Sequence, residues 1–306
     1  MQKKSTIRLI LAVLLLTFGI TTQAEIKTIK DVLGREVNVD VPVKNAVLGF
    51  YYPDYIAVTG VENFKYVKGI SREFWEKFNP GSWALFSEKM PELKNIADIG
   101  NVNTGTFSTE KTLALKPDVL ILAEWQYQTI GSELPKLEQA GVPIIVVDFN
   151  AQSVERHTQS AKIFGQLAGT EERANKIADE YAQGIADIQK RVKEANLPKP
   201  KIYVEFGNKG PSEYSFTFGK NMWGAIAETV GGDNVSAPFV ENWGPINPEQ
   251  LLAAQPEVIM ISGTEMGHET NNEMMAMGIN INEQDAQKRL KGFLTDRKST
   301  RLNSSH

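Results

Sequence analysis

A unit made of a short helical pattern, a proline and an apolar run occurs twice in this chain. Residues Ser108–Leu122 align without a gap on residues Asn247–Ile261, at an offset of 139 positions. Each copy predicts an N-cap residue, a short helix, a proline that ends the helix and then a buried β-strand. A repeat of this kind predicts a chain with two similarly built halves.

The first half alternates strands with helices. Compact apolar runs at Asn45–Gly49, Asp118–Ala123 and Val142–Asp148 predict buried strands, and the helical patterns Thr109–Leu115 and Ile130–Ala140 lie between them. This order is typical of parallel α/β packing. A second α/β run begins later, with predicted strands at Lys201–Phe206 and Glu257–Ser262.

Between the two runs the pattern is helical throughout. A first helix ends near Gly169, a residue suited to a C-cap, and Thr170 is suited to cap the next helix. Apolar residues then recur at spacings of three and four over about 25 residues, which predicts a helix roughly 37 Å long. We therefore expect two lobes, at residues 25–152 and 197–295, joined by helices over residues 153–196.

The repeat also predicts an incomplete second lobe. The strand Val142–Asp148 would correspond to residues 281–287, but these residues read as the start of a helix. No apolar run follows them. Residues 296–306 are polar, basic and without periodicity, so we expect a non-native tail there, with a natural disordered tail as the alternative.

The N-terminus has the pattern of a secretory signal peptide. Three basic residues precede the apolar run Leu9–Ile20, and the small residue Ala24 follows it. The run is shorter than the roughly 20 residues that a membrane-spanning helix needs. We expect cleavage after residue 24 and an exported protein; an uncleaved membrane anchor is the alternative.

Composition excludes several classes of function. The chain has no cysteine, which excludes thiol catalysis, disulfides and cysteine-bound metals, and its three histidines provide poorly for a metal cage. The net charge of −4 argues against nucleic acid as a partner. Phosphate-binding loops, nucleophile elbows and zinc-protease motifs are missing from the sequence. We therefore expect no enzymatic activity.

Aromatic residues near the predicted strand ends suggest a binding site. Ligands of open α/β sheets bind outside the carboxyl ends of the strands, and aromatic side chains suit a large or flat ligand. Arg72, Lys209 and Lys220 are candidates to pair with negative charge on that ligand. The aromatic candidates for ligand contact are Tyr51, Tyr52, Trp83, Trp125, Tyr127, Tyr214, Trp223 and Trp243.

Four motifs carry a family resemblance: Asp31–Val37, Glu110–Ile121, Gly231–Val235 and Asn247–Ile259. Together they resemble the periplasmic binding proteins of the ABC importers for iron complexes and vitamin B12. The resemblance implies a class III fold, in which one long rigid helix joins two Rossmann-like α/β lobes and the ligand lies between the lobes. It also implies a periplasmic location, and a role for Glu110 and Glu249 in docking onto the permease dimer.

These observations lead us to expect a monomeric receptor for a ferric chelate, in particular an Fe(III)–siderophore, with no permanently bound cofactor. Haem, cobalamin or an oxyanion remain alternative ligands, and Tyr51 or Tyr52 could ligate iron directly as a phenolate. A chelatase-like or nitrogenase-like α/β subunit and a surface adhesion protein are alternatives from other classes. A nitrogenase-like or chelatase-like enzyme would need cysteine or histidine ligands, which the composition provides poorly.

Overall fold

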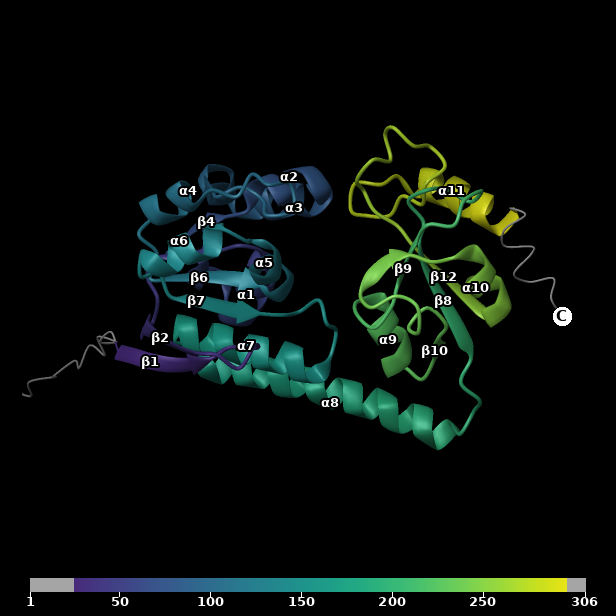
Figure 1. Ribbon diagram of the computed structural model, residues 1–306, viewed down its shortest axis with the longest axis horizontal. Helices are drawn as coiled ribbons and strands as arrows, with labels where there is room; N and C mark the ends of the chain where they lie inside the picture. The colour runs from purple at the N-terminus through teal and green to yellow at the C-terminus, as the bar shows by residue number, and fades with distance from the viewer. Residues whose placement is uncertain (1–24, 296–306) are drawn as a thin grey trace, which may run out of the picture.

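The structure is a computed structural model that describes residues 25–295. The expected signal peptide and the expected non-native tail lie outside the described residues. Within them, the chain builds two separate five-stranded sheets, one from residues 46–147 and the other from residues 201–262. Figure 1 shows helices α7 and α8 running below the sheets, with α8 reaching from the first sheet towards the second.

The first sheet is wholly parallel, and its strand order is β5-β4-β3-β6-β7. Its strands are β3 (Ala46–Leu48), β4 (Val67–Ile70), β5 (Ala97–Asp98), β6 (Val119–Ala123) and β7 (Ile144–Val147). Every residue of β3, β6 and β7 is buried, which explains why these strands read as continuous apolar runs. The three predicted strands are confirmed, each shorter than expected by one to three residues.

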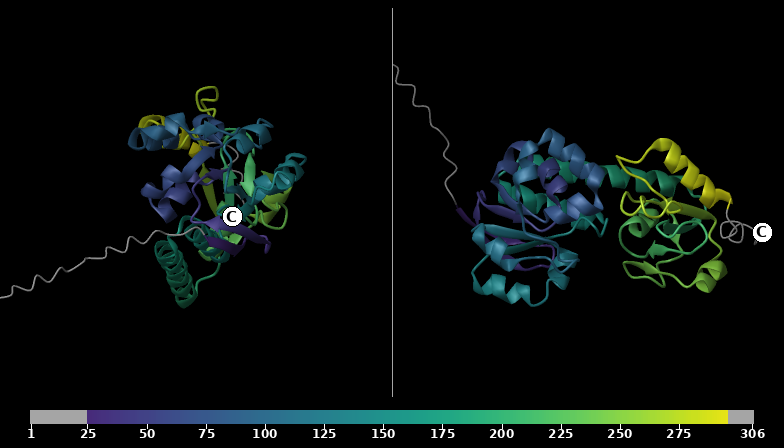
Figure 2. Two further views of the ribbon diagram at one scale, coloured as in Figure 1. Left: turned by 90° about the vertical axis from the view of Figure 1, so that its left-hand side faces the viewer. Right: turned by 90° about the horizontal axis from the view of Figure 1, so that it is seen from above.

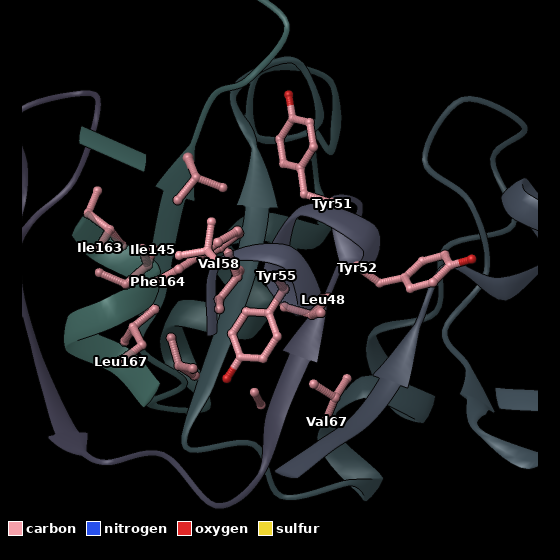
Figure 3. Close-up of a cluster of buried hydrophobic side chains, with 14 of the residues drawn as sticks. Leu48, Tyr51, Tyr52, Tyr55, Val58, Val67, Ile145, Ile163, Phe164 and Leu167 are labelled. Atoms are coloured by element: carbon pink, nitrogen blue, oxygen red, sulfur yellow. The ribbon is translucent and has the colours of Figure 1, made fainter. Parts of the chain in front are cut away.

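Helices cover both faces of this sheet, and a hairpin of β1 (Glu25–Lys30) and β2 (Glu36–Val41) precedes it. The helices are α1 (Tyr52–Thr59), α2 (Arg72–Phe78), α3 (Pro80–Lys89), α4 (Thr109–Ala114), α5 (Glu124–Thr129) and α6 (Glu133–Gln139), with 3₁₀ turns η1 (Val61–Tyr66) and η2 (Pro91–Asn95). Figure 3 shows the core between the sheet and α1 and α7, where Leu48, Tyr55, Val58, Phe164 and Leu167 pack together.

The region of Trp75, Trp83 and Phe86 forms helices α2 and α3. Pro80 occupies the first helical position of α3, where a missing N–H costs nothing. The rings of Trp75, Trp83 and Phe86 all pack around Tyr52. This ring packing supports α3, whose first residues, Pro, Gly and Ser, have weak helix propensity.

Two antiparallel helices follow the first sheet, α7 (Val154–Ala168) and α8 (Glu171–Ala195). Gly169 between them adopts φ 70°, as expected for a C-cap, and α8 has the expected 25 residues. Thr170 does not cap α8 with its side chain. A Cβ on Gly165 would lie 2.4 Å from the Cβ of Ala174, so the helices cross closely at that glycine.

The second sheet is mixed. It contains β8 (Lys201–Phe206), β9 (Phe216–Phe218), β10 (Asp233–Asn234), β11 (Trp243–Pro245) and β12 (Val258–Ser262). Strand β8 is parallel to β10 and β12 and antiparallel to β9, and β11 extends the sheet beyond β9. Its helices are α9 (Trp223–Thr229), α10 (Pro248–Ala254) and α11 (Glu283–Thr295). The predicted helix start at residues 281–287 is thus confirmed as α11.

The structure confirms the repeat as α4–β6 in the first half and α10–β12 in the second. Both helices and both strands start at the expected offset. The surroundings differ, however. Val119 and Ile121 of β6 are 0% and 2% exposed, whereas Val258 and Met260 at the matching positions of β12 are 41% and 38% exposed. Strand β6 lies between β3 and β7, but β12 pairs only with β8 among the described residues.

Candidate ligand-binding site

The candidate site lies where the strand order of the first sheet reverses. From β3 the chain goes to β4 on one side, and from β6 it goes to β7 on the other. Ligands of open α/β sheets bind outside the carboxyl ends of the strands at such a switch point. The buried amide of Gln126 connects the ends of these two strands: it donates to the Gly49 carbonyl at 2.8 Å and accepts from the Ala123 N–H at 3.1 Å.

Aromatic rings gather near the carboxyl ends of these strands. Phe50 follows β3, and its ring centroid lies 5.3 Å from that of Trp125 at the start of α5. It also lies 4.8 Å from Phe74 and 5.4 Å from Trp75, both on α2. We call Phe50, Phe74, Trp75 and Trp125 the first aromatic group. Sequence reasoning selected Trp125 but missed Phe50, although its place directly after a predicted strand was the signal that could have identified it.

Tyr51 and Tyr52 are buried in the core and are not exposed on the surface. Tyr51 is 5% exposed, and its hydroxyl accepts a hydrogen bond of 3.2 Å from the Asn150 N–H. Tyr52 is 0% exposed, and its hydroxyl has no partner among the described residues. Figure 3 shows the two rings pointing in different directions from the start of α1. They therefore do not form a pair of ligands around one point.

The protonation of these tyrosines also argues against direct iron binding. Burial raises the pKa of Tyr51 well above its usual range, and the nearby charge of Asp148 raises it further. Burial alone raises the pKa of Tyr52. Because a phenolate ligand must lose its proton, both environments oppose ligation. Among residues 25–295 there is also no cluster of three His, Asp or Glu side chains that could hold a metal ion.

Two of the three basic candidates are engaged within the protein. The Arg72 guanidinium lies 3.3 Å from Glu76 and donates to the Lys94 carbonyl at 3.0 Å. The Lys220 ammonium lies 2.6 Å from the Glu241 carboxylate. Lys209 is exposed in the segment after β8. The structure thus leaves Arg72 and Lys220 poorly placed to neutralise a strongly anionic ligand.

Tyr127 does not belong to the first aromatic group. The Arg35 guanidinium stacks 4.3 Å from its ring centroid and donates to its hydroxyl at 3.0 Å. Trp83 lies on α3, where its ring contacts that of Tyr52 at 6.3 Å rather than Phe50. Tyr214 packs in the core of the second half with Tyr203. Sequence position alone could not distinguish these inward-facing rings from exposed ones.

The second half presents its own aromatic surface. Trp243, on β11, is 52% exposed, and its centroid lies 5.0 Å from Phe216 and 6.1 Å from Phe206 at the end of β8. Trp223, the first residue of α9, is 44% exposed. We call Phe206, Phe216 and Trp243 the second aromatic group. Two large, half-exposed indoles on a polar surface are a common mark of a binding site.

A backbone hydrogen bond connects the two halves next to these rings. The Met222 N–H donates to the Asn150 carbonyl at 3.1 Å. Asn150 also donates to Tyr51, and Met222 immediately precedes Trp223. The structure therefore brings Tyr51 and the start of α9 close together, although they are far apart in the sequence.

Acidic side chains lie near the first aromatic group. Burial raises the pKa of Glu124, which lies 3.4 Å from Arg156, and burial raises the pKa of Asp54 to about 6. The buried Asp148 carboxylate accepts from the Asn150 N–H at 2.8 Å and the Ala151 N–H at 3.1 Å. The local balance of charge near this group is therefore not positive.

Two surface depressions lie away from both aromatic groups. One, of about 350 Å³, is bounded by Arg35 and residues 141–144, near the start of β7. The other, of about 580 Å³, lies between the β1–β2 hairpin and α7. Neither is lined by a residue of the aromatic groups. We assign the site by the carboxyl ends of the strands rather than by these depressions.

Glu110 and Glu249 occupy equivalent exposed positions. Each lies in the first turn of its helix, α4 or α10. The Ser108 side chain accepts from the Lys111 N–H at 3.2 Å, and the Asn247 side chain accepts from the Glu249 N–H at 2.8 Å. The two predicted caps are thus confirmed, and they place the two carboxylates alike.

The sequence matches the family model described as periplasmic binding protein over residues 80–284, more than half of the chain. The chain belongs to the periplasmic binding protein family. Among solved structures, the chain is similar to the TroA-like periplasmic binding protein FepB from Veillonella parvula. The two are 30% identical with a TM-score of 0.78, and the match covers 92% of this chain and 81% of that one.

A more distant solved structure shares the fold, and a curated relative matches part of the sequence. The molybdate-binding protein MolA from Haemophilus influenzae is 18% identical with a TM-score of 0.60, and the match covers 77% of this chain and 73% of that one. The vitamin B12-binding protein of Pectobacterium atrosepticum is 26% identical over 60% of this chain. That match spans 62% of the relative's length, less than two thirds.

Proposed function

We propose that this protein is the substrate-binding component of an ABC importer, and that it captures a ferric chelate, in particular an Fe(III)–siderophore. Family membership and the likeness to FepB and to vitamin B12-binding proteins support a receptor of this class. The observation that carries the proposal is the gathering of aromatic rings at the carboxyl ends of β3, β6 and β8. No chemical bond of the ligand is changed, and the ligand leaves when the receptor docks on its permease.

The architecture that we propose is the class III arrangement. Residues 25–152 and 197–295 would form two Rossmann-like lobes, and α7 and α8 in residues 153–196 would join them. A helix bends less readily than a strand hinge, so the lobes would move little when the ligand binds. Residues 1–24 would direct export to the periplasm. None of the helices in residues 25–295 is long and apolar enough to cross a membrane.

Aromatic contact, rather than charge, is the basis for ligand recognition in this proposal. Arg72 and Lys220 already pair with carboxylates, which disfavours a small oxyanion as the ligand. The raised pKa values of Tyr51 and Tyr52 disfavour phenolate ligation of haem iron. An organic shell around the metal, as in a siderophore or a cobalamin, would instead stack on Trp125 and Trp243.

Tryptophan fluorescence tests the proposal directly. We expect quenching by a ferric tris-hydroxamate and no quenching by molybdate. Trp125→Ala and Trp243→Ala should each weaken binding by about 2 kcal/mol, roughly thirtyfold, because stacked and desolvated rings are contact hot spots. Tyr66→Ala is the matched control, since Tyr66 lies at the amino end of β4, opposite to the carboxyl ends of the strands.

Two results would contradict the proposal in different ways. Tight binding of molybdate with weak binding of every chelate would indicate an oxyanion receptor. Saturable chelate binding that neither tryptophan variant changes would place the ligand elsewhere on the protein. Binding of cyanocobalamin in preference to the ferric chelate would keep the receptor function and change its ligand.

A further inference from the structure

A buried carboxylate joins the second half of the molecule to a helix of the first. Glu265 is 9% exposed and lies in the segment 263–282, between β12 and α11. Its Oε2 accepts a hydrogen bond of 2.6 Å from the Gly81 N–H, and its Oε1 accepts one of 3.0 Å from the Asn280 N–H. Gly81 is the second residue of α3, so its N–H has no partner within the helix. The contact therefore gives a hydrogen-bond partner both to a backbone N–H at the helix end and to a buried carboxylate.

Two glycines make room for this carboxylate. A Cβ on Gly81 would lie 2.2 Å from Glu265 Oε1, and a Cβ on Gly278 would lie 2.1 Å from Glu265 Cγ. Real Cβ atoms essentially never approach other atoms so closely. A side chain at either position would therefore displace the Glu265 carboxylate from its present place.

The segment that carries Glu265 is fixed to the second half. Arg289 of α11 is 7% exposed, and its guanidinium donates to the carbonyls of Asn271 at 2.8 Å, Met274 at 3.0 Å and His268 at 3.2 Å. Figures 1 and 2 show this segment above the second sheet, on the side that faces α2 and α3. Glu265 is therefore held in place relative to the second half.

On the other side of the contact, α3 carries part of the ring packing below the site. Trp83 of α3 contacts Tyr52, and Tyr52 contacts Trp75 of the first aromatic group at 4.9 Å. The position of α3 thus influences how the first aromatic group is held. The second connection between the halves, from Met222 to Asn150, involves backbone atoms alone.

We propose that Glu265 is a latch that holds the two halves in the arrangement of this structure, which we call closed; an open arrangement differs from it by the small movement that α7 and α8 allow. The buried carboxylate is stable only while amide donors surround it, and the open arrangement would return it to water. Release of the Gly81 N–H from Glu265 then accompanies each such opening. Glu265 is a positioning residue, and the inference does not depend on the identity of the ligand.

The test measures the distance between the halves. The chain has no cysteine, so Glu88→Cys on α3 and Lys291→Cys on α11 provide two unique labelling sites on exposed residues. In this background, Glu265→Ala should shift the open-to-closed ratio towards open about tenfold, because a charge-assisted hydrogen bond is lost. The measured label distances should widen, and the Gly81 amide should exchange faster with solvent. Glu269→Ala removes an exposed acid from the same segment and should change neither quantity.

Gly81→Ala tests the contact from the other side. Alanine favours a helix over glycine, so at an open position this change would stabilise α3. If Glu265 is the latch, the new Cβ displaces its carboxylate, and the label distances widen as in Glu265→Ala. In the Glu265→Ala background, Gly81→Ala should then widen them no further. Unchanged label distances in both single variants, together with unchanged Gly81 exchange in Glu265→Ala, would overturn the proposal.

Discussion

Two neighbouring tyrosines with different hydroxyl environments provide a matched pair of mutations. Tyr51→Phe removes one of two acceptors from the Asn150 N–H, which keeps its 2.8 Å bond to Asp148, so it should lower the free energy of unfolding by at most about 1 kcal/mol. Tyr52→Phe removes a buried hydroxyl with no partner among the described residues, so it should leave that free energy unchanged or raise it by about 1 kcal/mol. Urea unfolding followed by fluorescence measures both. A clear loss of stability in Tyr52→Phe would mean that its hydroxyl is hydrogen-bonded in solution.

Asp54 should make the stability of the protein depend on pH. Burial raises its pKa from the ordinary 3.8 to about 6 in the folded chain. The folded state therefore binds its proton more tightly than the unfolded state, so the contribution to stability is complete below about pH 4 and is lost as the pH rises through about 6.

The variant Asp54→Asn should remove this dependence. At neutral pH it should be more stable than the natural sequence by about 2 kcal/mol, and the difference should vanish below about pH 4. Melting temperatures of both proteins across this range provide the measurement. A difference that stays constant with pH would show that Asp54 is solvated in the folded state.

At the level of single residues, the sequence predicted the correct region of the candidate site but several incorrect side-chain contacts. Tyr51 and Tyr52 do follow a strand that ends at the candidate site, but both rings turn into the core. Whether such a ring is buried depends on α2, α3 and α7, which come from other parts of the chain. For the same reason the Glu265–Gly81 contact, between residues 184 positions apart, has no signature in the local sequence.

Among the elements, the repeated α–β unit allows a matched comparison of two valines. Val119→Ala in β6 should cost about 2 kcal/mol or more, because the side chain is fully buried. Val258→Ala at the matching position of β12 should cost less than about 1 kcal/mol, because this side chain is 41% exposed. Urea unfolding of each variant measures the difference. Equal costs would mean that something not described in this structure covers β12 in solution.

Elements with strong local signals were predicted well, and those held by distant contacts were not. The strands β6 and β12, the caps Ser108 and Asn247 and the long helix α8 follow from apolar periodicity and capping chemistry, which act over a few residues. Helix α3 begins with Pro, Gly and Ser, which have weak helix propensity, and both α2 and α3 place rings around Tyr52. The very short strands β5 and β10 have two residues each and leave no pattern to detect.

For the whole molecule, the equivalent placement of Glu110 and Glu249 supports a test of docking. If each meets a basic residue of a permease subunit, the double variant Glu110→Lys/Glu249→Lys puts like charges together, which costs several kcal/mol at an interface. Ligand affinity in solution should stay the same, while ligand-stimulated ATP hydrolysis by the reconstituted importer should fall steeply. Each single variant should be intermediate.

Glu172→Lys is the matched control for this experiment. Glu172 is also an exposed acid in the first turn of a helix, α8, so the change has the same effect on the helix dipole without touching α4 or α10. Transport-linked activity that falls equally in the control would assign the loss to helix stability. Normal activity in the double variant would remove both residues from the docking surface.

Among the described residues, the chain passes from the first sheet to the second only once, through α7 and α8. Every strand of the first sheet is therefore synthesised before any strand of the second. No strand of the first sheet pairs with a strand of the second, which is made later. Domains of a growing chain fold as units, N-terminal first. The first half can complete its sheet while the second half is still being made, so misfolding through premature pairing between halves is avoided by the order of synthesis itself.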